Sequence, residues 1–279
     1  ALFGASNSKL INEQSGAMEL GENGVGIWGA NKITSSLATW GKNIDITNSG
    51  TIKGISGKAG IFGIYANNDI TTHSGATSIL SHSGTIDLSQ NIKSTGIFMK
   101  NGILTSTGNI FVKEASVAVK ATDSTENVSG GTYIVGKESL GFKLTATSSG
   151  TLPVFNGIGG NISMTESGSV AYLLEGGTYN SGLGNNFIDN LALTSTNGYT
   201  YINVKNATLN YRHTKAINND ETIFVNSNAT ILELMNGTNL SSTKQKVTGI
   251  YATNGGSVDN AGKITLLGAN SSAMYATTD

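Results

Sequence analysis

The chain has 279 residues with a formal net charge of −1, and only 13% of its residues are charged. Its single arginine and scattered lysines exclude a nucleic-acid surface, which needs clustered cations. The absence of cysteine excludes a disulfide framework, and the lack of any run of about 18 apolar residues excludes a membrane-spanning helix.

Residues 1–23 are weakly patterned, and a unit with two halves recurs along most of the remaining chain. The first half reads Gly-x-Ile-x-Leu or a close variant, with copies that begin at Gly50, Gly84, Gly108, Gly131, Gly160 and Gly262. The second half reads Gly-Ile-aromatic-small or a variant, with copies that begin at Gly26, Gly63, Gly96, Gly141, Val170, Gly249 and Ala273. Self-similarity at such a period indicates stacked structural units.

Each half alternates apolar and polar residues, which is typical of a strand with one buried face. The halves are short and end in Gly, Asn, Ser or Thr, so each strand needs a neighbour from the next unit. The sequence therefore predicts an all-β fold, a parallel β-helix (solenoid) of about a dozen rungs. We expect the right hand, by analogy with the commonest solenoids and with parallel crossovers in general. The single proline, Pro153, agrees with a stack that uses nearly every backbone N–H.

We expect residues 1–279 to be a single β-helix segment of a longer solenoid. Residues 177–247 lose the clear unit, although they keep alternating stretches such as 199–204 and 230–234. Two interpretations of 177–247 stay open: less regular rungs, or a protruding insertion.

The returning unit near the C-terminus carries a family resemblance. Gly249-Ile250-Tyr251-Ala252 is followed by Asn254-Gly255, Val258, Asn260, Gly262, Ile264 and Leu266, and residues 44–52 and 63–67 are similar. This pattern resembles the passenger region of the large type V autotransporter adhesins of fusobacteria. The resemblance implies a surface rod, anchored to the outer membrane by a barrel in a region outside this sequence. It also implies adhesion to other bacteria (coaggregation) or to host cells.

The sequence offers little for catalysis or for cofactor binding. The histidines, His73, His82 and His213, lack the spacing of a zinc site, and the carboxylates are scattered. We therefore expect no catalytic residue, no metal and no cofactor.

The third residue of each second half faces outward if its neighbours face the core. These residues are expected to form a column on one outer face: Trp28, Tyr65, Phe98, Ala118, Lys143, Tyr172, Tyr251 and Tyr275. Aromatic members of such a column suit contact with a sugar or a protein partner. The alternative is that the rings only pack on one another and stabilise the rod.

A second candidate patch lies in the irregular segment. Tyr199, Tyr201, Tyr211, Arg212 and Lys215 combine tyrosine with cations, a mixture favoured at binding hot spots. The alternative is a degenerate rung with ordinary solvated charges.

The sequence therefore predicts an adhesive rod on a bacterial surface that binds a surface protein or glycan of another cell, without catalysis. Two alternatives remain: a β-helical carbohydrate-active enzyme, and a spacer whose recognition site lies elsewhere in a longer chain. The identity of the receptor stays open at this point.

Overall fold

The computed structural model describes residues 1–5, 8–32, 43–69, 78–147, 153–181, 192–195, 199–212, 214–216, 222–227, 231–253 and 256–277. Within these ranges the chain forms 29 strands and no helix. The prediction of an all-β fold is therefore confirmed.

One sheet of 11 strands runs along the described chain. Its strands, in spatial order, are β1 (Leu2–Gly4), β4 (Val25–Lys32), β7 (Phe62–Asp69), β10 (Thr95–Lys100), β13 (Val117–Thr122), β15 (Leu140–Thr145), β17 (Val170–Glu175), β20 (Thr200–Lys205), β23 (Thr222–Ser227), β26 (Thr248–Thr253) and β29 (Ser272–Thr277). Spatial order follows chain order, so each strand lies beside the equivalent strands of the units before and after it. We call this the first sheet.

A second sheet packs against the first, and its two arms meet at a long strand. One arm contains β2 (Lys9–Asn12), β5 (Asp45–Asn48), β8 (Ser78–His82) and β11 (Gly102–Ser106). The other arm contains β3 (Ala17–Leu20), β6 (Thr51–Gly54), β9 (Thr85–Leu88) and β12 (Asn109–Val112). Both arms join β14 (Thr125–Val135), which also pairs with β16 (Val154–Met164), and β16 pairs with β19 (Ala192–Ser195).

Two smaller sheets follow towards the C-terminus. The first contains β18 (Thr178–Ser181), β21 (Thr208–Tyr211), β24 (Ile231–Leu234) and β27 (Ser257–Asn260), and the other contains β22 (Thr214–Ala216), β25 (Asn239–Ser242) and β28 (Lys263–Leu266). Strands therefore occur within residues 177–247, and β20 of this segment pairs with β17 before it in the first sheet.

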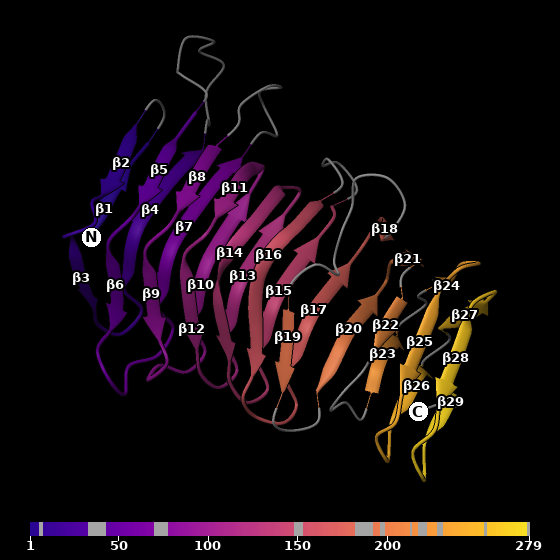
Figure 1. The fold of residues 1–279 in the computed structure, drawn as a ribbon. Helices are drawn as coiled ribbons and strands as arrows, with labels where there is room; N and C mark the ends of the chain where they lie inside the picture. The colour runs from indigo at the N-terminus through magenta and orange to yellow at the C-terminus, as the bar shows by residue number, and fades with distance from the viewer. Residues whose placement is uncertain are drawn as a thin grey trace.

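All pairings between these strands are parallel. Figure 1 shows the strands side by side from the indigo N-terminal end to the yellow C-terminal end, with the two termini at opposite ends. Long parallel sheets stacked face to face require a core that continues from unit to unit.

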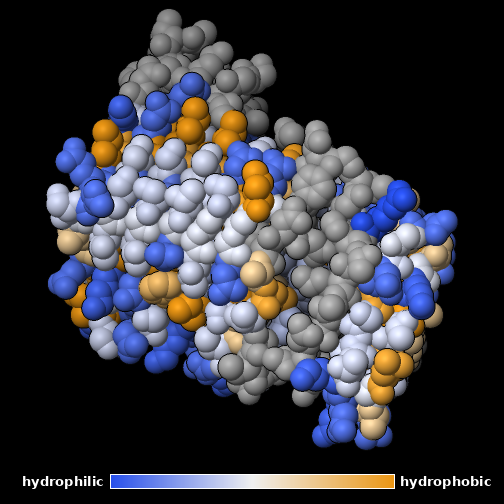
Figure 2. All heavy atoms as spheres, viewed as in Figure 1, coloured by the Kyte–Doolittle hydropathy of each residue, from blue (hydrophilic) through white to orange (hydrophobic). Residues whose placement is uncertain are grey.

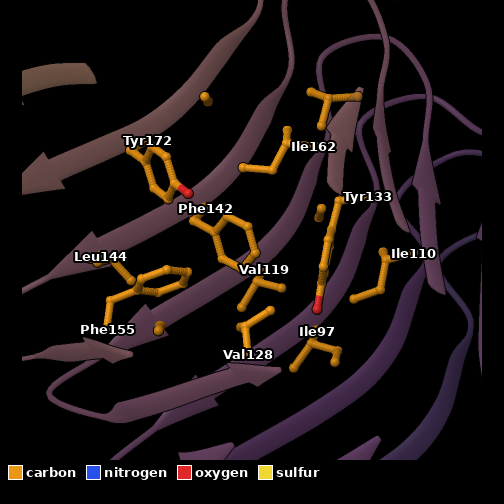
Figure 3. Packing of buried hydrophobic residues seen from close by; sticks show 14 of the residues in the cluster. Ile97, Ile110, Val119, Val128, Tyr133, Phe142, Leu144, Phe155, Ile162 and Tyr172 are labelled. Atoms are coloured by element: carbon orange, nitrogen blue, oxygen red, sulfur yellow. The ribbon is translucent and has the colours of Figure 1, made fainter. Parts of the chain in front are cut away.

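That core is a run of apolar side chains between the sheets. Ile27, Ile64 and Ile97 of the first sheet are fully buried, as are Ile52, Ile86 and Ile110 of the second. Aromatic rings replace isoleucine further along, where Phe142 lies 4.9 Å from Tyr133 and 5.7 Å from Tyr172 between ring centroids. Figure 3 shows these rings between the two layers of strands.

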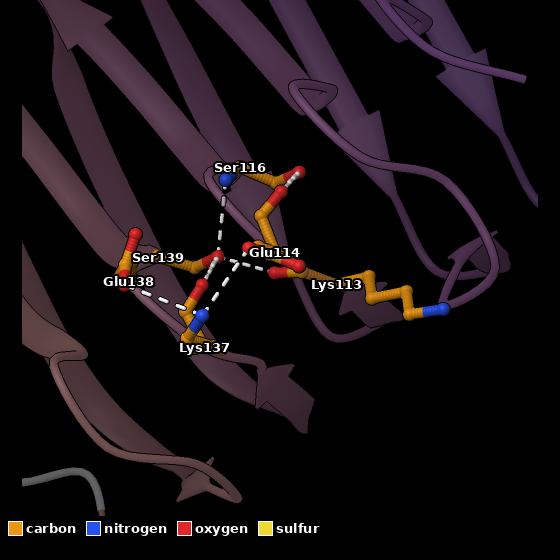
Figure 4. Close-up of polar contacts among 6 residues, drawn as sticks. All are labelled: Lys113, Glu114, Ser116, Lys137, Glu138 and Ser139. Atoms are coloured by element: carbon orange, nitrogen blue, oxygen red, sulfur yellow. Dashed lines mark hydrogen bonds and ion pairs between the residues drawn. The ribbon is translucent and has the colours of Figure 1, made fainter.

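A serine marks the corner that leads into many strands of the first sheet. Ser94 donates its backbone N–H to the hydroxyl of Ser116 at 3.0 Å, and Ser116 donates to Ser139 in the same way. The residue before each of these serines has a positive φ, and the serine hydroxyl satisfies a buried N–H at that sharp turn. Figure 4 shows this corner, where Lys137 lies 3.4 Å from Glu114 and 3.5 Å from Glu138.

Glycine is required where consecutive units approach most closely. The backbone N–H of Gly84 donates to the carbonyl of Asn48, and Thr85 donates to the carbonyl of Gly50. A Cβ atom on Gly84 would collide with the carbonyl oxygen of Gly50. The glycine that begins each first-half repeat is therefore explained by close stacking of backbone on backbone.

Candidate functional site

The register of the first sheet lines up one residue from each of its 11 strands. The register joins Phe3 to Trp28, Trp28 to Tyr65, and Tyr65 to Phe98. The line continues through Lys120, Lys143, Leu173, Asn203, Val225, Tyr251 and Tyr275. We call these 11 residues the outer column, and we call Phe3, Trp28, Tyr65 and Phe98 the aromatic row.

Neighbouring rings in the aromatic row contact one another. The centroid distances are 5.2 Å from Phe3 to Trp28, 6.1 Å from Trp28 to Tyr65 and 4.8 Å from Tyr65 to Phe98. The first two contacts are edge-to-face, and the third is stacked with 14° between the planes. Such contacts contribute about 0.5–1.5 kcal/mol each beyond the area they bury.

Mutual packing still leaves part of the aromatic row open to solvent. Phe3 is 67% exposed and Trp28 is 44% exposed, whereas Tyr65 and Phe98 are half-buried. Phe62 lies beside the row, with its ring 5.7 Å from that of Tyr65. The row therefore presents aromatic surface at its N-terminal end and denser packing towards Phe98.

Lysines continue the outer column after the aromatic row. The ammonium of Lys120 lies 5.5 Å from the ring centroid of Phe98, a cation–π contact. The next member, Lys143, pairs with Glu175 at 2.6 Å, and the same carboxylate lies 3.8 Å from Lys205. The outer column thus changes from apolar to cationic within one strand spacing.

The C-terminal end of the outer column carries a separate aromatic pair. Tyr251 and Tyr275 stack with 5.5 Å between centroids and 6° between planes. Tyr275 is 53% exposed and Tyr251 is half-buried. Both residues face outward as the sequence predicts.

Tyr172 does not belong to the outer column, so its predicted outward orientation is wrong. Its side chain is 1% exposed, and the register aligns it with buried Phe142. Leu173 takes the outward place beside Lys143. A slip of one residue moves a strand side chain to the opposite face, and the predicted alignment of 170–173 was one residue out of step.

The predicted patch around Tyr211 is also corrected. Tyr199, Tyr201 and Tyr211 are all buried, Tyr211 completely. Arg212 is exposed, whereas the side chain of Lys215 lies outside the described residues. The tyrosines therefore belong to the core and do not form a surface with Arg212.

Five members of the outer column are absent from the sequence predictions: Phe3, Lys120, Leu173, Asn203 and Val225. Phe3 stands in Leu2-Phe3-Gly4, which lacks the opening glycine of the repeat, and Lys120 stands in Val117-Ala118-Val119-Lys120, which lacks the aromatic residue. In this copy the sequence analysis predicted Ala118 as the outward residue, but Ala118 is buried. Counting the alternation from the buried Val119 would have found Lys120.

Figure 2 shows one face of the molecule, where a broad pale band of residues of intermediate hydropathy lies towards the N-terminal end. Hydrophobic residues appear as separate orange spots around that band. Outward positions of the second sheet are mixed. Thr51, Thr85 and Asn109 align in one arm and are polar, whereas the aligned Ile79 and Ile103 of the other arm are 44% and 37% exposed.

A histidine and a glutamate, His82 and Glu126, lie inside the core. Burial lowers the pKa of His82 to about 4, although hydrogen bonds to Asn109 and Asn48 raise it in part. Burial raises the pKa of Glu126 well above its usual value, and neither carboxyl oxygen has a hydrogen-bond partner. Burial therefore favours the uncharged form of each group, and His82 is neutral at neutral pH.

Across the described part of the chain, no group of three or more His, Asp or Glu side chains is placed to hold a metal ion. The described part of the chain also forms no helix long and apolar enough to cross a membrane.

Comparison with known proteins assigns no family. No family model matches the chain, and no curated protein matches it. A solved structure that matches is the A-module of the mannuronan C-5 epimerase AlgE6 of Azotobacter vinelandii, at 10% identity and a TM-score of 0.39. The match covers 99% of this chain and 90% of that one. A likeness of that size assigns neither a substrate nor a reaction.

Proposed function

We propose that this chain is an adhesive segment of a bacterial surface protein, built as a right-handed parallel β-helix of about a dozen coils. The 11-stranded sheet in chain order supports a coil, because each unit returns beside the one before it. The general preference of parallel crossovers supports the right hand. Pairing of β20 with β17 supports one continuous segment through 177–247.

The observation that carries the adhesive role is the aromatic row on the outer face. Phe3 and Trp28 expose apolar rings to solvent although neither is needed to close the core. Exposed aromatic side chains on a rigid sheet are well suited to binding, because little conformational entropy is lost on contact. A rod with such a surface can attach to a partner without any reacting group.

The family resemblance supports the proposed location at the cell surface. Within its motif, Ile250 is fully buried and Tyr251 stacks on Tyr275. The Gly-Ile-aromatic-small half of the repeat therefore combines a core residue with an outer aromatic residue. The proposed anchor in the outer membrane lies in a region outside this chain, and the proposed partner is a surface protein or glycan of another cell.

Attachment is tested with beads that carry the purified chain. Beads coated with residues 1–279 are mixed with suspensions of bacteria and of epithelial cells, and the bound beads are counted under flow. We expect the coated beads to attach and soluble chain to compete with them. Beads coated to the same density that attach no better than albumin-coated beads would contradict the adhesive role and favour a spacer.

A further inference from the structure

We infer that the aromatic row together with Lys100 and Lys120 binds a single extended chain of an anionic polysaccharide. This inference rests on the adhesive role proposed above and names the class of partner. It places sugar rings against the aromatic row and the acidic groups of the glycan near the two lysines.

The spacing of the aromatic row suits a linear polymer of rings. Successive centroids lie 5.2, 6.1 and 4.8 Å apart, because each ring comes from the next strand of the sheet. From Trp28 to Lys120 the outer column crosses three strand spacings, roughly 14 Å. In an extended chain of linked pyranose rings, each sugar advances the chain by about one strand spacing. Roughly three or four sugars therefore cover the distance from Trp28 to Lys120.

The row also has the amphipathic character that sugars need. The rings of Phe3 and Trp28 offer apolar surface to the C–H face of a pyranose. The hydroxyl of Tyr65 accepts a hydrogen bond from the Asn67 amide at 3.2 Å, which leaves its own proton available as a donor. Apolar contact and hydroxyl contact therefore lie side by side on neighbouring strands of the first sheet.

Positive charge lies at the far end of the aromatic row. Lys100 follows Phe98 on the same outward face of β10, and its register partners, Asn67 and Thr122, are uncharged. Lys120 contacts the Phe98 ring and no carboxylate within the described residues. Lys143, by contrast, is neutralised by Glu175. Two cations beside an apolar row complement an acidic ligand.

The shape of the surface favours a glycan over a protein. The aromatic row is narrow, and polar Asn67 and Lys100 border it on one side. A stable protein interface covers about 800 Å² on each partner, which extends well beyond this row. A single polysaccharide chain fits along the row and gains its affinity from repetition.

The test uses polymers that share a backbone and differ in charge. Affinity electrophoresis of residues 1–279 is run in gels that contain carboxymethylcellulose or hydroxyethylcellulose, and dextran sulfate or dextran. We expect retardation by an anionic polymer, weaker in high salt, and little by its neutral counterpart. The carboxylate and sulfate arms show which acidic group is preferred.

Variants test whether the retardation depends on the aromatic row and on the two lysines. Trp28→Ala is expected to weaken binding about tenfold, and Lys100→Gln with Lys120→Gln should reduce both the affinity and its salt dependence. Ile55→Ala is the matched control, because Ile55 is 46% exposed and belongs to no strand of the first sheet. Circular dichroism verifies the fold, and the lysine variant remains informative if Trp28→Ala does not fold.

Three results would overturn the inference. Equal retardation by charged and neutral polymers would remove the anionic specificity. Undiminished retardation of the lysine variant, or of a folded Trp28→Ala, would place binding elsewhere. Absence of retardation while coated beads still attach to cells would leave the adhesive role intact and indicate a protein partner.

Discussion

The side-chain amide of Asn48 lies 3.1 Å from Nδ1 of His82 in the interior. An amide nitrogen is only a donor, so this ring nitrogen accepts, and the ring proton sits on Nε2, 3.3 Å from the carbonyl oxygen of Asn109. Asn12 donates to the Oδ1 of Asn48 at 2.8 Å, which makes a buried polar ladder across three strands. Protonation of His82 would place an N–H on Nδ1 that faces the N–H of the Asn48 amide, so two donors would meet. It would also place a charge in the core.

The first prediction follows from the sign of that pKa shift. The folded pKa of His82 is about 4 against 6.5 for the free side chain, so the unfolded chain binds the extra proton between these values. The stabilising effect of neutral His82 is complete above pH 6.5 and is lost as the pH falls to about 4. The shift corresponds to about 3 kcal/mol of unfolding free energy.

The measurement compares the parent with His82→Asn, which continues the ladder with a group that does not titrate. Urea unfolding at several pH values between 7 and 4 should show the parent losing stability relative to this variant. A difference between the two proteins that is constant with pH would contradict the prediction.

Glu126 should have the opposite pH dependence. Its raised pKa means that the folded chain retains a proton that the unfolded chain releases above about pH 4.5. Stability from this group is therefore present at low pH and declines as the pH rises towards its folded pKa. Glu126→Leu should raise the unfolding free energy at neutral pH by about 1–3 kcal/mol, because two unpaired buried oxygens are removed.

Register partners of Glu126 are the buried residues Leu104 and Phe155, so leucine extends an existing apolar column. Denaturation of the variant at pH 4.5 and pH 8 provides the check. The gain should be larger at pH 8. A gain of equal size at both pH values would show that ionisation of Glu126 is not responsible.

Gly84→Ala should destabilise the stack by about 1–3 kcal/mol. The added methyl group meets the carbonyl of Gly50, which already accepts the N–H of Thr85 at 3.0 Å, so relieving the clash would disturb this hydrogen bond. Gly21→Ala is the matched control, because nothing lies within 4 Å of its Cβ position and its φ is not positive. Thermal unfolding should show no loss for the control, and equal losses in both variants would refute close stacking at Gly84.

Ser116→Ala should cost about 1–3 kcal/mol, because the buried N–H of Ser94 loses its acceptor. Ser83→Ala serves as the comparison, since the hydroxyl of Ser83 makes an exposed contact of 3.2 Å with that of Ser49. Hydrogen exchange at the Ser94 amide should accelerate in the first variant alone. Unchanged exchange at the Ser94 amide would mean that the Ser116 hydroxyl does not protect this corner.

The repeat predicted the core well where its spacing is strict. Ile52, Ile86 and Ile110 were expected inside from Gly-x-Ile, and all three are fully buried. Glycine at the preceding corner fixes the phase of each strand, so alternation then decides which residues face the core. Ile264 of the last copy is only partly buried, because β28 has a paired strand on one side only within the described chain.

Prediction failed where the repeat loses that phase marker. Val170-Ala171-Tyr172-Leu173 has no glycine, and the aromatic residue alone suggested the outer face. Phe142, Tyr172 and Tyr201 instead fill an interior that smaller aliphatic residues occupy elsewhere. Residue type alone does not distinguish an inward from an outward aromatic side chain, because ring contacts stabilise both positions.

Buried Glu126 was not predicted either. A carboxylate in an alternating strand is expected to face solvent, since burial of a charge is costly. Register with β11 and β16 places this residue inward, and burial raises its pKa, which favours the protonated form that is less costly to bury. Long-range pairing thus overrides the local preference.

The account depends most on the aromatic row as the surface of attachment. The direct measurement is attachment of beads coated with the variant that carries Trp28→Ser, Tyr65→Ser and Phe98→Ser, with circular dichroism to verify the sheet content. We predict that attachment is lost while the β-sheet spectrum is kept. Undiminished attachment by the folded variant would contradict the account.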